Sequence, residues 1–433
     1  MTIPTRTTRR ARLVFAAAAA AYLVAIVHRT ALGVAGVEAL DRFHIGATGL
    51  AALSIAQIAT YAALQVPAGR LLDKLGPRTM LVGGSLLMAA GQALMAVNHD
   101  YKIALLARVL IGIGDAPIFI TASRLVAHWF PPRRAPMMVQ VTAQIGQVGQ
   151  LTTAIPVAWL LHAQGWSTTF LALAGLGVVA AALVSVVRSP NDADRAGSPG
   201  LAAERVRGTV SAAGVRLGFW THFTALFSAN TIALLWGVPF FITAQGRSPA
   251  EASVLLTVLT LGKFVASPIV GTVTARHPLR RSWLVLIFAG VTAVAWIALL
   301  LPSTPRPMWQ LVIFVAVVAA GGPISLVGLD YARTFADHDH LGAANGRVNA
   351  GGFVSTIVAV GLIGIVLQLA APDGNYDLGA YRLAFASLAL PWGVGVLGIL
   401  RNRRGARADW AADGVVLPPV RDAWARRKAR RLK

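Results

Sequence analysis

The sequence contains no cysteine, and only 13% of its 433 residues are charged. The absence of cysteine excludes disulfide scaffolds and zinc sites built from thiolates. Soluble domains carry roughly 25% charged residues, so this chain has too few for a water-exposed surface. Acidic residues are scarcest, with 17 Asp and Glu against 39 Lys and Arg. What is abundant is hydrophobic sequence, 56% of the chain, which excludes intrinsic disorder and predicts a polytopic membrane protein.

Long hydrophobic runs predict twelve membrane-spanning helices, because one bilayer crossing takes about 20 mostly apolar residues. The runs are 12–37, 46–68, 79–98, 101–126, 136–161, 167–188, 216–243, 249–275, 281–302, 308–334, 346–371 and 379–400. Arginines precede the first run, but the run continues to full spanning length. We therefore expect a first helix there and not a cleavable signal peptide.

A polar segment divides these spans into two sets of six. The expected parts are an N-terminal six-helix bundle (1–188), a cytoplasmic central loop (189–215), a C-terminal six-helix bundle (216–400) and a basic cytoplasmic tail (401–433). The two halves also echo each other, since GDAP at 114–117 in the fourth span parallels GGP at 321–323 in the tenth. Parallel six-helix halves are one repeat architecture of secondary transporters.

The positions of Lys and Arg predict the orientation in the membrane. If the N-terminus is cytoplasmic, inside segments hold 31 of these residues, outside loops hold five and the spans hold three. The positive-inside rule then places both termini in the cytoplasm and the protein in the inner (plasma) membrane. The net charge of +22 arises mostly from Lys and Arg in the predicted cytoplasmic segments. The basic tail is expected to contact lipid and not nucleic acid.

The loop after the second span, residues 69–78, reads GRLLDKLGPR. Its glycines permit a tight turn, and Asp73 can face a helix N-terminus or a cationic partner. The spacing resembles the G-x-L-x-D-x-x-G-x-[RK] signature of the major facilitator superfamily. This resemblance implies twelve helices in two pseudo-symmetric six-helix bundles, with Asp73 and Arg78 in conformational gating.

Further motifs within residues 28–170 resemble the anion:cation symporters, the organic-anion/proton symporters that include sugar-acid transporters. Residues 108–134 read RVLIGIGDAPIFITASRLVAHWFPPRR, similar to R-x3-G-x-G-E-A-P…W-F-P. Residues 28–32 (HRTAL) are similar to D-R-x-x-L, and residues 61–69 contain Y-x3-Q-x-P-x-G. The resemblance implies proton coupling at two positions where this chain departs from the pattern, His28 for the first acid and Asp115 for a glutamate.

Two arginines are predicted at similar depth in spans one and four. Arg29 lies about 12 Å and Arg108 about 10 Å from the outer ends, at 1.5 Å per residue. Guanidinium groups lining one cavity repel each other unless an anion lies between them, and their fork of donors suits a carboxylate. Both are therefore candidates to bind a substrate carboxylate. The alternative is that each pairs with a carboxylate, chiefly Asp115, and only stabilises the bundle.

Asp115 is the leading candidate to carry a coupled proton. It lies two turns after Arg108 on the same helix face, so a substrate that occupies Arg108 would change the charge beside it. The alternative is a permanent ion pair with Arg29 or Arg108. His28 is the second candidate, since histidine titrates near neutral pH, and its alternative is a hydrogen-bonded structural histidine.

Neutral polar side chains recur on two further spans and are candidates to bind hydroxyl groups. Gln57, Tyr61 and Gln65 follow one face of span two, and Gln140, Gln144 and Gln147 share a face of span five. Of these, Tyr61, Gln144 and Gln147 are the predicted substrate-binding residues, with helix–helix hydrogen bonding as the alternative. Lys263, near mid-depth of span eight, is either a second anion contact or snorkels to the inner side.

A cytoplasmic gate is predicted from the internal echo. When Pro117 is aligned with Pro323, Arg124 of span four stands opposite Asp330 of span ten. Both lie about 33–35 Å from their outer ends, at the cytoplasmic mouth. Opposite charges there would close the mouth when the substrate path opens outward. The alternative is that each contacts headgroups or its own loop.

The predicted function is a secondary active transporter that moves a small organic anion, such as a sugar acid, by proton symport. Its partners are the substrate, protons and the lipid bilayer; no cofactor or metal is expected, and a monomer is the default. The alternative is a multidrug/proton antiporter, although GQVGQ at 146–150 lacks the Gly-Pro pair usual in such exporters. A protease is disfavoured because its second aspartate is missing from the spans, and a transport-inactive sensor is the last rival.

Overall fold

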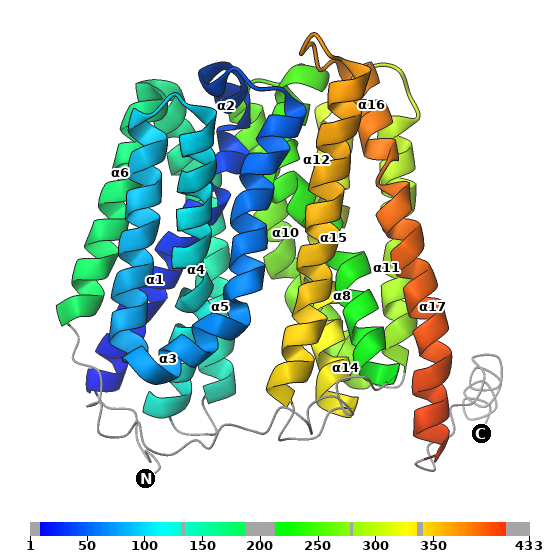
Figure 1. Ribbon diagram of the computed structural model, residues 1–433. Coiled ribbons are helices and arrows are strands. Elements are labelled where there is room, and N and C mark those ends of the chain that lie inside the picture. The colour runs from blue at the N-terminus through cyan, green and yellow to red at the C-terminus, as the bar shows by residue number, and fades with distance from the viewer. Residues whose placement is uncertain (1–8, 131–134, 187–212, 278–279, 336–340, 413–433) are drawn as a thin grey trace.

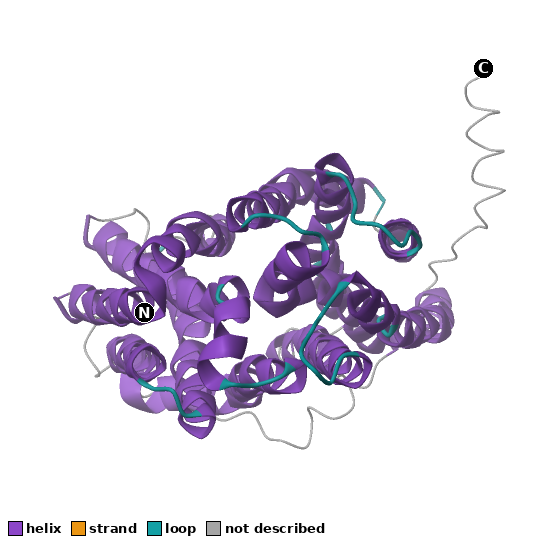
Figure 2. Ribbon diagram, turned by 90° about the horizontal axis from the view of Figure 1, so that it is seen from above, coloured by secondary structure: helices purple, strands orange, loops and turns teal. Residues whose placement is uncertain are grey.

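The computed structural model describes residues 9–130, 135–186, 213–277, 280–335 and 341–412. Helices account for nearly all of these residues, and the described part contains no strand (Figure 2). Most of the predicted central loop (189–215) and of the predicted tail (401–433) lies outside the described residues. Where the tail is described, α17 continues as helix to Ala412, and Arg403 stacks 4.4 Å above the Trp283 ring.

The helices fall into two groups along the chain (Figure 1). The N-terminal half contains α1 (Arg9–Val34), α2 (Gly36–Phe43), α3 (Ala47–Val97), α4 (Tyr101–Trp129), α5 (Ala135–Thr152), the π-turn η1 (Thr153–Val157) and α6 (Ala158–Val186). The C-terminal half contains α8 (Ala213–Thr231), η3 (Ile232–Trp236), α9 (Gly237–Pro239), η4 (Phe240–Ala244), α10 (Pro249–Arg276), α11 (Arg281–Leu300), α12 (Met308–Ala319), α13 (Gly321–Ser325), α14 (Val327–Phe335), α15 (Leu341–Ala370), α16 (Leu378–Ala386) and α17 (Ala389–Ala412).

Eleven stretches of the described chain are long and apolar enough to cross a bilayer. One of them, Val141–Ser185, has 45 residues. A straight helix of that length would measure about 67 Å, twice the roughly 30 Å hydrocarbon core. The helix is interrupted at Gly165, whose φ of 74° is open to glycine at little cost. This stretch therefore holds two crossings, and the predicted all-α fold with twelve spans is confirmed.

Helix caps fix where the chain re-enters the bundle. Ser248 and Glu251 form a reciprocal capping box at the start of α10, with Pro249 in the first helical position. The side chain of Asp100 accepts backbone N–H bonds at the start of α4, and that of Asp377 does so at the start of α16. Each cap satisfies donors that a helix end would otherwise leave without partners.

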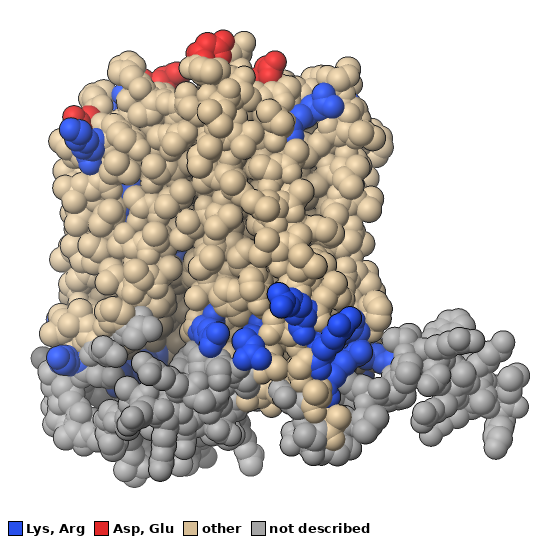
Figure 3. Space-filling view, turned by 45° about the vertical axis from the view of Figure 1, so that its right-hand side comes forward, with Lys and Arg blue, Asp and Glu red and all other residues tan. Residues whose placement is uncertain are grey.

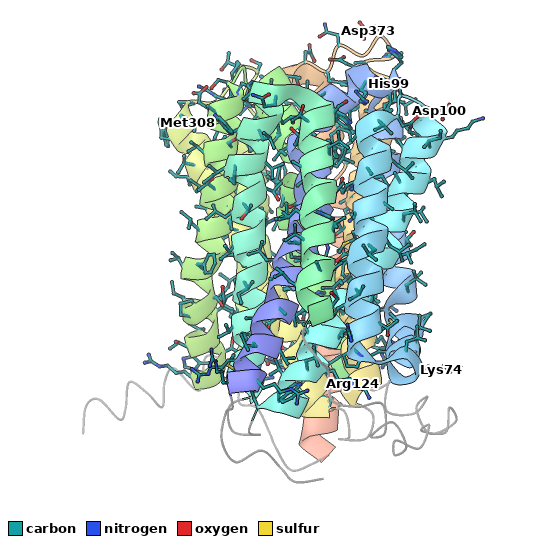
Figure 4. The ribbon with its side chains drawn as sticks, turned by 90° about the vertical axis from the view of Figure 1, so that its left-hand side faces the viewer. Lys74, His99, Asp100, Arg124, Met308 and Asp373 are labelled. Carbon is teal, nitrogen blue, oxygen red and sulfur yellow. The ribbon has the colours of Figure 1, made fainter. Side chains whose placement is uncertain are left out.

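The two ends of the bundle differ in charge. We call the end where α1 begins and α17 ends the terminal end, and the other the opposite end (Figure 1). On the face shown in Figure 3, Lys and Arg gather mainly at the terminal end, with a few near the opposite end, whereas the visible Asp and Glu lie at the opposite end. Figure 4 likewise places Lys74 and Arg124 at the terminal end, and Asp100 and Asp373 at the opposite end. A cytoplasmic terminal end, as the positive-inside rule requires, stays a prediction.

At the opposite end the two halves pack tightly against each other. Thr48 Oγ1 of α3 donates to the carbonyl of Gly364 in α15 at 3.2 Å. The backbone N–H of Ala47 donates to the Tyr376 hydroxyl at 2.6 Å. A Cβ at Gly364 would lie 2.6 Å from the Cβ of Ala51, so only glycine permits this approach. To open this end, α3 and α15 must separate.

Gly364→Val should therefore hold the opposite end open. The added side chain cannot fit against Ala51 and the Ala47 carbonyl, which would lie 2.6 and 3.0 Å from its Cβ. We expect Ala47→Cys, introduced into this cysteine-free chain at a position that is 0% exposed and lies against Gly364, to react with a membrane-impermeant maleimide several-fold faster when Gly364→Val is also present.

Gly361→Val is the matched control for this experiment. It adds the same side chain one turn earlier, where the nearest atom to a new Cβ is the flexible end of Ile55 at 3.4 Å. Equal labelling rates in the Gly361→Val and Gly364→Val backgrounds would contradict the role assigned to the close approach.

Candidate functional site

A cavity of about 160 Å³ lies between the two halves. The N-terminal half contributes most of the polar lining, namely Tyr22, Arg29, Thr30, Gln57, Tyr61, Asp115, Gln147 and Gln150. The C-terminal half adds Asn230 and Lys263, together with Phe353. Pockets for drug-sized ligands measure roughly 300–1,000 Å³, so this cavity suits a small solute.

A bidentate ion pair joins Arg29 of α1 to Asp115 of α4 inside this cavity. Arg29 Nε donates to Asp115 Oδ2 at 2.6 Å, and Nη2 donates to Oδ1 at 2.8 Å. The Asp115 side chain is 1% exposed and the Arg29 side chain 18%. One whole edge of the guanidinium fork is thus occupied by the carboxylate, which is the strongest geometry available to this pair.

The aromatic ring of Tyr61 stacks against the face of the Arg29 guanidinium. The Arg29 Cζ lies 4.4 Å from the centre of the Tyr61 ring, a cation–π distance. The same ring meets Phe353 of α15 edge to face, with centroids 5.1 Å apart. Tyr61 therefore connects the ion pair of the N-terminal half to the wall formed by the C-terminal half.

Arg108 and Gln144 are not among the residues that line the cavity. Arg108 is 1% exposed, and its Nε donates to the carbonyl of Leu53 in α3 at 3.2 Å. Arg108 and Asp115 share a face of α4, as their spacing predicts, but the long arginine side chain turns toward the α3 backbone. Of the two predicted carboxylate-binding arginines, the structure places only Arg29 at the cavity.

His28 points away from the cavity. Its Nε2 lies 2.9 Å from the carbonyl oxygen of Leu173 in α6, and the residue is completely buried. Successive helix residues point about 100° apart, so placing Arg29 in the cavity turns His28 toward the neighbouring helices. The structure therefore brings Asp115 to the site and leaves His28 in the packing between α1 and α6.

Two amide side chains line the cavity with polar atoms that have no hydrogen-bond partner in the described structure. Neither Oε1 nor Nε2 of Gln57 has one, and Oε1 of Gln147 has none. Buried amide groups are costly without hydrogen-bond partners, and at a cavity wall a solute or a water molecule can supply them. The Gln57 and Gln147 stripes were visible in the sequence, whereas only the fold reveals that Gln150 also reaches this cavity.

Lys263 of α10 enters the cavity from the C-terminal half. Its Nζ donates to Gln150 Oε1 at 2.6 Å, across the interface between the halves. The residue is 9% exposed. Of the two roles that the sequence left open, anion contact or snorkelling, the structure places its ammonium group at the cavity wall.

Comparison with known proteins identifies the family. The sequence profile of the Major Facilitator Superfamily matches residues 18–243 and again residues 218–431. The chain belongs to the Major Facilitator Superfamily. The twofold match shows that each half of this chain resembles the same family pattern, in keeping with the two bundles and the internal echo.

Individual relatives of this superfamily member are distant. The Escherichia coli protein named "Probable L-galactonate transporter" is 26% identical over 176 residues, which cover 40% of this chain and 39% of that protein. The chain thus spans about two fifths of that relative. The E. coli "Probable galactarate/D-glucarate transporter GarP" is 21% identical over 382 residues, covering 78% of this chain and 84% of that protein.

The fold is shared with a solved superfamily structure. The crystal structure of a bacterial homologue of the human lysosomal transporter Spinster, inward-facing and unoccupied, aligns with a TM-score of 0.75. The alignment covers 92% of this chain and 98% of that one at 14% identity. At this identity the likeness concerns the fold alone.

The predicted gating residues lie toward the terminal end of this superfamily fold. Arg124 is exposed at that end (Figure 4), and Arg78 is also exposed. Asp330 in α14 is half-buried, and its carbonyl accepts a bond from Arg281 Nη1 at 3.1 Å. The side chain of Asp73 lies outside the described residues.

Proposed function

We propose that this chain is a secondary active transporter that carries a small organic anion together with a proton. One observation carries the proposal, the bidentate pair between Arg29 and Asp115 in a cavity between the two halves. Arg29 would bind the substrate carboxylate, and Asp115 would bind the proton. Two halves that rock about a central site provide alternating access.

The ion pair explains why anion and proton would bind together. The Asp115 carboxylate accepts from the Arg29 donors that an incoming carboxylate needs. Protonation of Asp115 removes its charge and releases the fork, and a substrate carboxylate then replaces it. Each ligand favours the other, which is positive coupling in the thermodynamic sense. A shared site for proton and substrate would instead make them compete, as antiport requires.

The cavity favours a hydroxylated carboxylate. Gln57 and Gln147 present buried amide atoms without partners, which suit substrate hydroxyl groups. Gln144, which the sequence predicts to bind substrate together with Tyr61 and Gln147, is not among the residues that line the cavity. The names of the relatives, transporters of sugar acids, support the same class. A cavity of about 160 Å³ is small for the substrates of a multidrug exporter.

We further propose that the protein lies in the inner membrane with both termini cytoplasmic. The support is the concentration of Lys and Arg at the terminal end and of acidic residues at the opposite end. Under this orientation the opposite end, where α3 packs against α15 at Ala51 and Gly364, faces the outside.

Uptake into proteoliposomes tests the function. Labelled gluconate, glucarate, galactonate and succinate would be offered with and without an inward proton gradient, alongside a lipophilic cation. We expect a sugar acid to accumulate only when the gradient is present. Efflux of the cation in exchange for protons, without uptake of any acid, would establish the multidrug antiporter in place of this proposal.

The proposed gate gives a separate prediction. The alignment of Pro117 with Pro323 puts Arg124 and Asp330 at equivalent positions of the two halves. An ion pair with an exposed partner such as Arg124 contributes only about 0–1 kcal/mol, enough to bias a balanced equilibrium. Arg124→Asp should slow transport, and adding Asp330→Arg should restore much of the rate in the same vesicle assay. A double variant no faster than the slower single variant would reject the pairing.

A further inference from the structure

The cavity contains a basic group that proton-coupled binding of one carboxylate does not use. Lys263 is the only basic residue that the C-terminal half contributes to the described lining, and Arg29 is the only one from the N-terminal half. Lys263 Nζ contacts Gln150 Oε1 at 2.6 Å. Within the described residues no carboxylate lies within ion-pair distance of Lys263.

A buried ammonium group held only by a neutral amide is poorly compensated. Its desolvation is offset when a charge of opposite sign is present, and a single neutral acceptor does this weakly. The group is also directed into a cavity and away from the lipid, where a basic side chain of this length would otherwise reach the membrane surface. The arrangement fits a site whose missing partner arrives with the substrate.

The formal charges of the lining point the same way. The described lining has two basic side chains, Arg29 and Lys263, and one acidic side chain, Asp115. Once Asp115 has taken the coupled proton, the two positive charges have no negative partner in the cavity. A monoanion would leave one of them unmatched, whereas a dianion matches both.

We propose that Lys263 is a specificity-determining residue that selects dianionic substrates, such as hydroxylated dicarboxylates, by binding the second carboxylate. This inference rests on the function proposed above and names the substrate class of the same site. One carboxylate takes the Arg29 fork, the other takes the Lys263 ammonium from Gln150, and the hydroxylated chain between them meets Gln57 and Gln147.

The two basic groups belong to different halves of the protein, and this should affect the transport rate. Arg29 belongs to α1 in the N-terminal half and Lys263 to α10 in the C-terminal half. A dianion therefore bridges the halves, while a monoanion binds to one of them. Bridging stabilises the state in which the halves close around the substrate, so a dianion should also be carried faster at saturation.

Matched pairs of acids test the inference in the full-length protein. Glucarate and gluconate share a six-carbon hydroxylated chain and differ in one terminal carboxylate, as do tartrate and threonate on four carbons. Dissociation constants would be measured by ligand-induced thermal stabilisation of the purified protein. We expect wild-type protein to bind at least one dianion about tenfold or more tighter than its monoanion, the range of a charge-assisted hydrogen bond.

Three variants separate recognition from folding. Lys263→Gln removes the charge and should weaken the dianion about tenfold while changing the monoanion less than twofold, which also shows that the variant is folded. Lys263→Arg keeps the charge and should retain most of the preference. Lys102→Gln makes the same change on an exposed lysine at the start of α4 and should change neither constant.

Each other outcome has a definite meaning. If wild-type protein binds monoanions as well as dianions, or if Lys263→Gln weakens both alike, Lys263 is a structural link to Gln150 and the inference is overturned while the proposed function stands. If wild-type protein binds none of the four acids and transports none, both proposals fall together.

Discussion

Asp115→Asn is expected to abolish concentrative uptake while leaving substrate exchange intact. With the membrane potential clamped at zero, one pH unit across the vesicle should drive about tenfold accumulation by wild-type protein at one proton per substrate. Asparagine cannot take up the proton, so the accumulation ratio should fall to about one. It also cannot form the ion pair that occupies the Arg29 fork, and binding and counterflow should therefore persist.

Asp373→Asn is the control for this loss. Asp373 is an exposed acid at the opposite end (Figure 4) and does not line the cavity, so its replacement should leave the tenfold accumulation unchanged. An Asp115→Asn protein that still concentrates substrate under an imposed pH gradient would place the proton site on another group. His28 would be the next candidate, although its ring nitrogen lies 2.9 Å from the Leu173 carbonyl outside the cavity.

The fold could be predicted from the sequence because its determinants are local. Apolar runs of spanning length, charged or glycine-containing breaks between them, and a bias of Lys and Arg toward one side together specify a twelve-span bundle. The one complication in the structure, a stretch of 45 residues that holds two crossings, depends on the single backbone conformation of Gly165. The sequence already divides this stretch at residues 162–166 (HAQGW), which separate the predicted spans 136–161 and 167–188.

The site could be predicted only in part, because it depends on which way each side chain leaves its helix. The adjacent pair His28 and Arg29 must point in different directions, and the sequence does not say which residue faces the cavity. Arg29 and Arg108 are predicted at similar depth in the membrane, so depth alone makes them equally good candidates. Depth does not specify the direction in which each side chain points. A long side chain such as that of Arg108 can also turn toward a backbone carbonyl, here that of Leu53.

Contacts between the halves were the least accessible to sequence reasoning. Gln150 and Lys263 are 113 positions apart and belong to different bundles. Neither residue belongs to a motif that indicates its role, and a lysine near the middle of a span could contact an anion or extend to the membrane surface. Only the packing of α5 against α10 shows that its ammonium group meets an amide at the cavity wall.

Arg29→Lys is expected to weaken substrate binding by about 10- to 100-fold, since a lost charge-assisted hydrogen bond costs about 1.5–3 kcal/mol. Lysine keeps the positive charge and can still pair with Asp115, so the fold should survive. Arg29→Ala is a poorer test, because removing one partner of a buried pair costs about 3–5 kcal/mol. What lysine loses is the two-pronged contact with a carboxylate and the flat face that lies 4.4 Å from the Tyr61 ring centre.

Arg42→Lys is a closely matched control for this effect. Arg42 also donates through Nε and Nη2, to the carbonyls of Asn98 and Ala96, and stacks on Trp166 at 5.5 Å, but it lies outside the cavity. The same change there should leave the dissociation constant unaltered.

Arg108→Lys separates two arrangements of the site. A loss as large as that of Arg29→Lys would favour a clamp of two arginines, whereas a much smaller loss is expected if the substrate lies between Arg29 and Lys263, because the Arg108 guanidinium is directed to the Leu53 carbonyl. Unchanged affinity in Arg29→Lys would show that the carboxylate binds elsewhere.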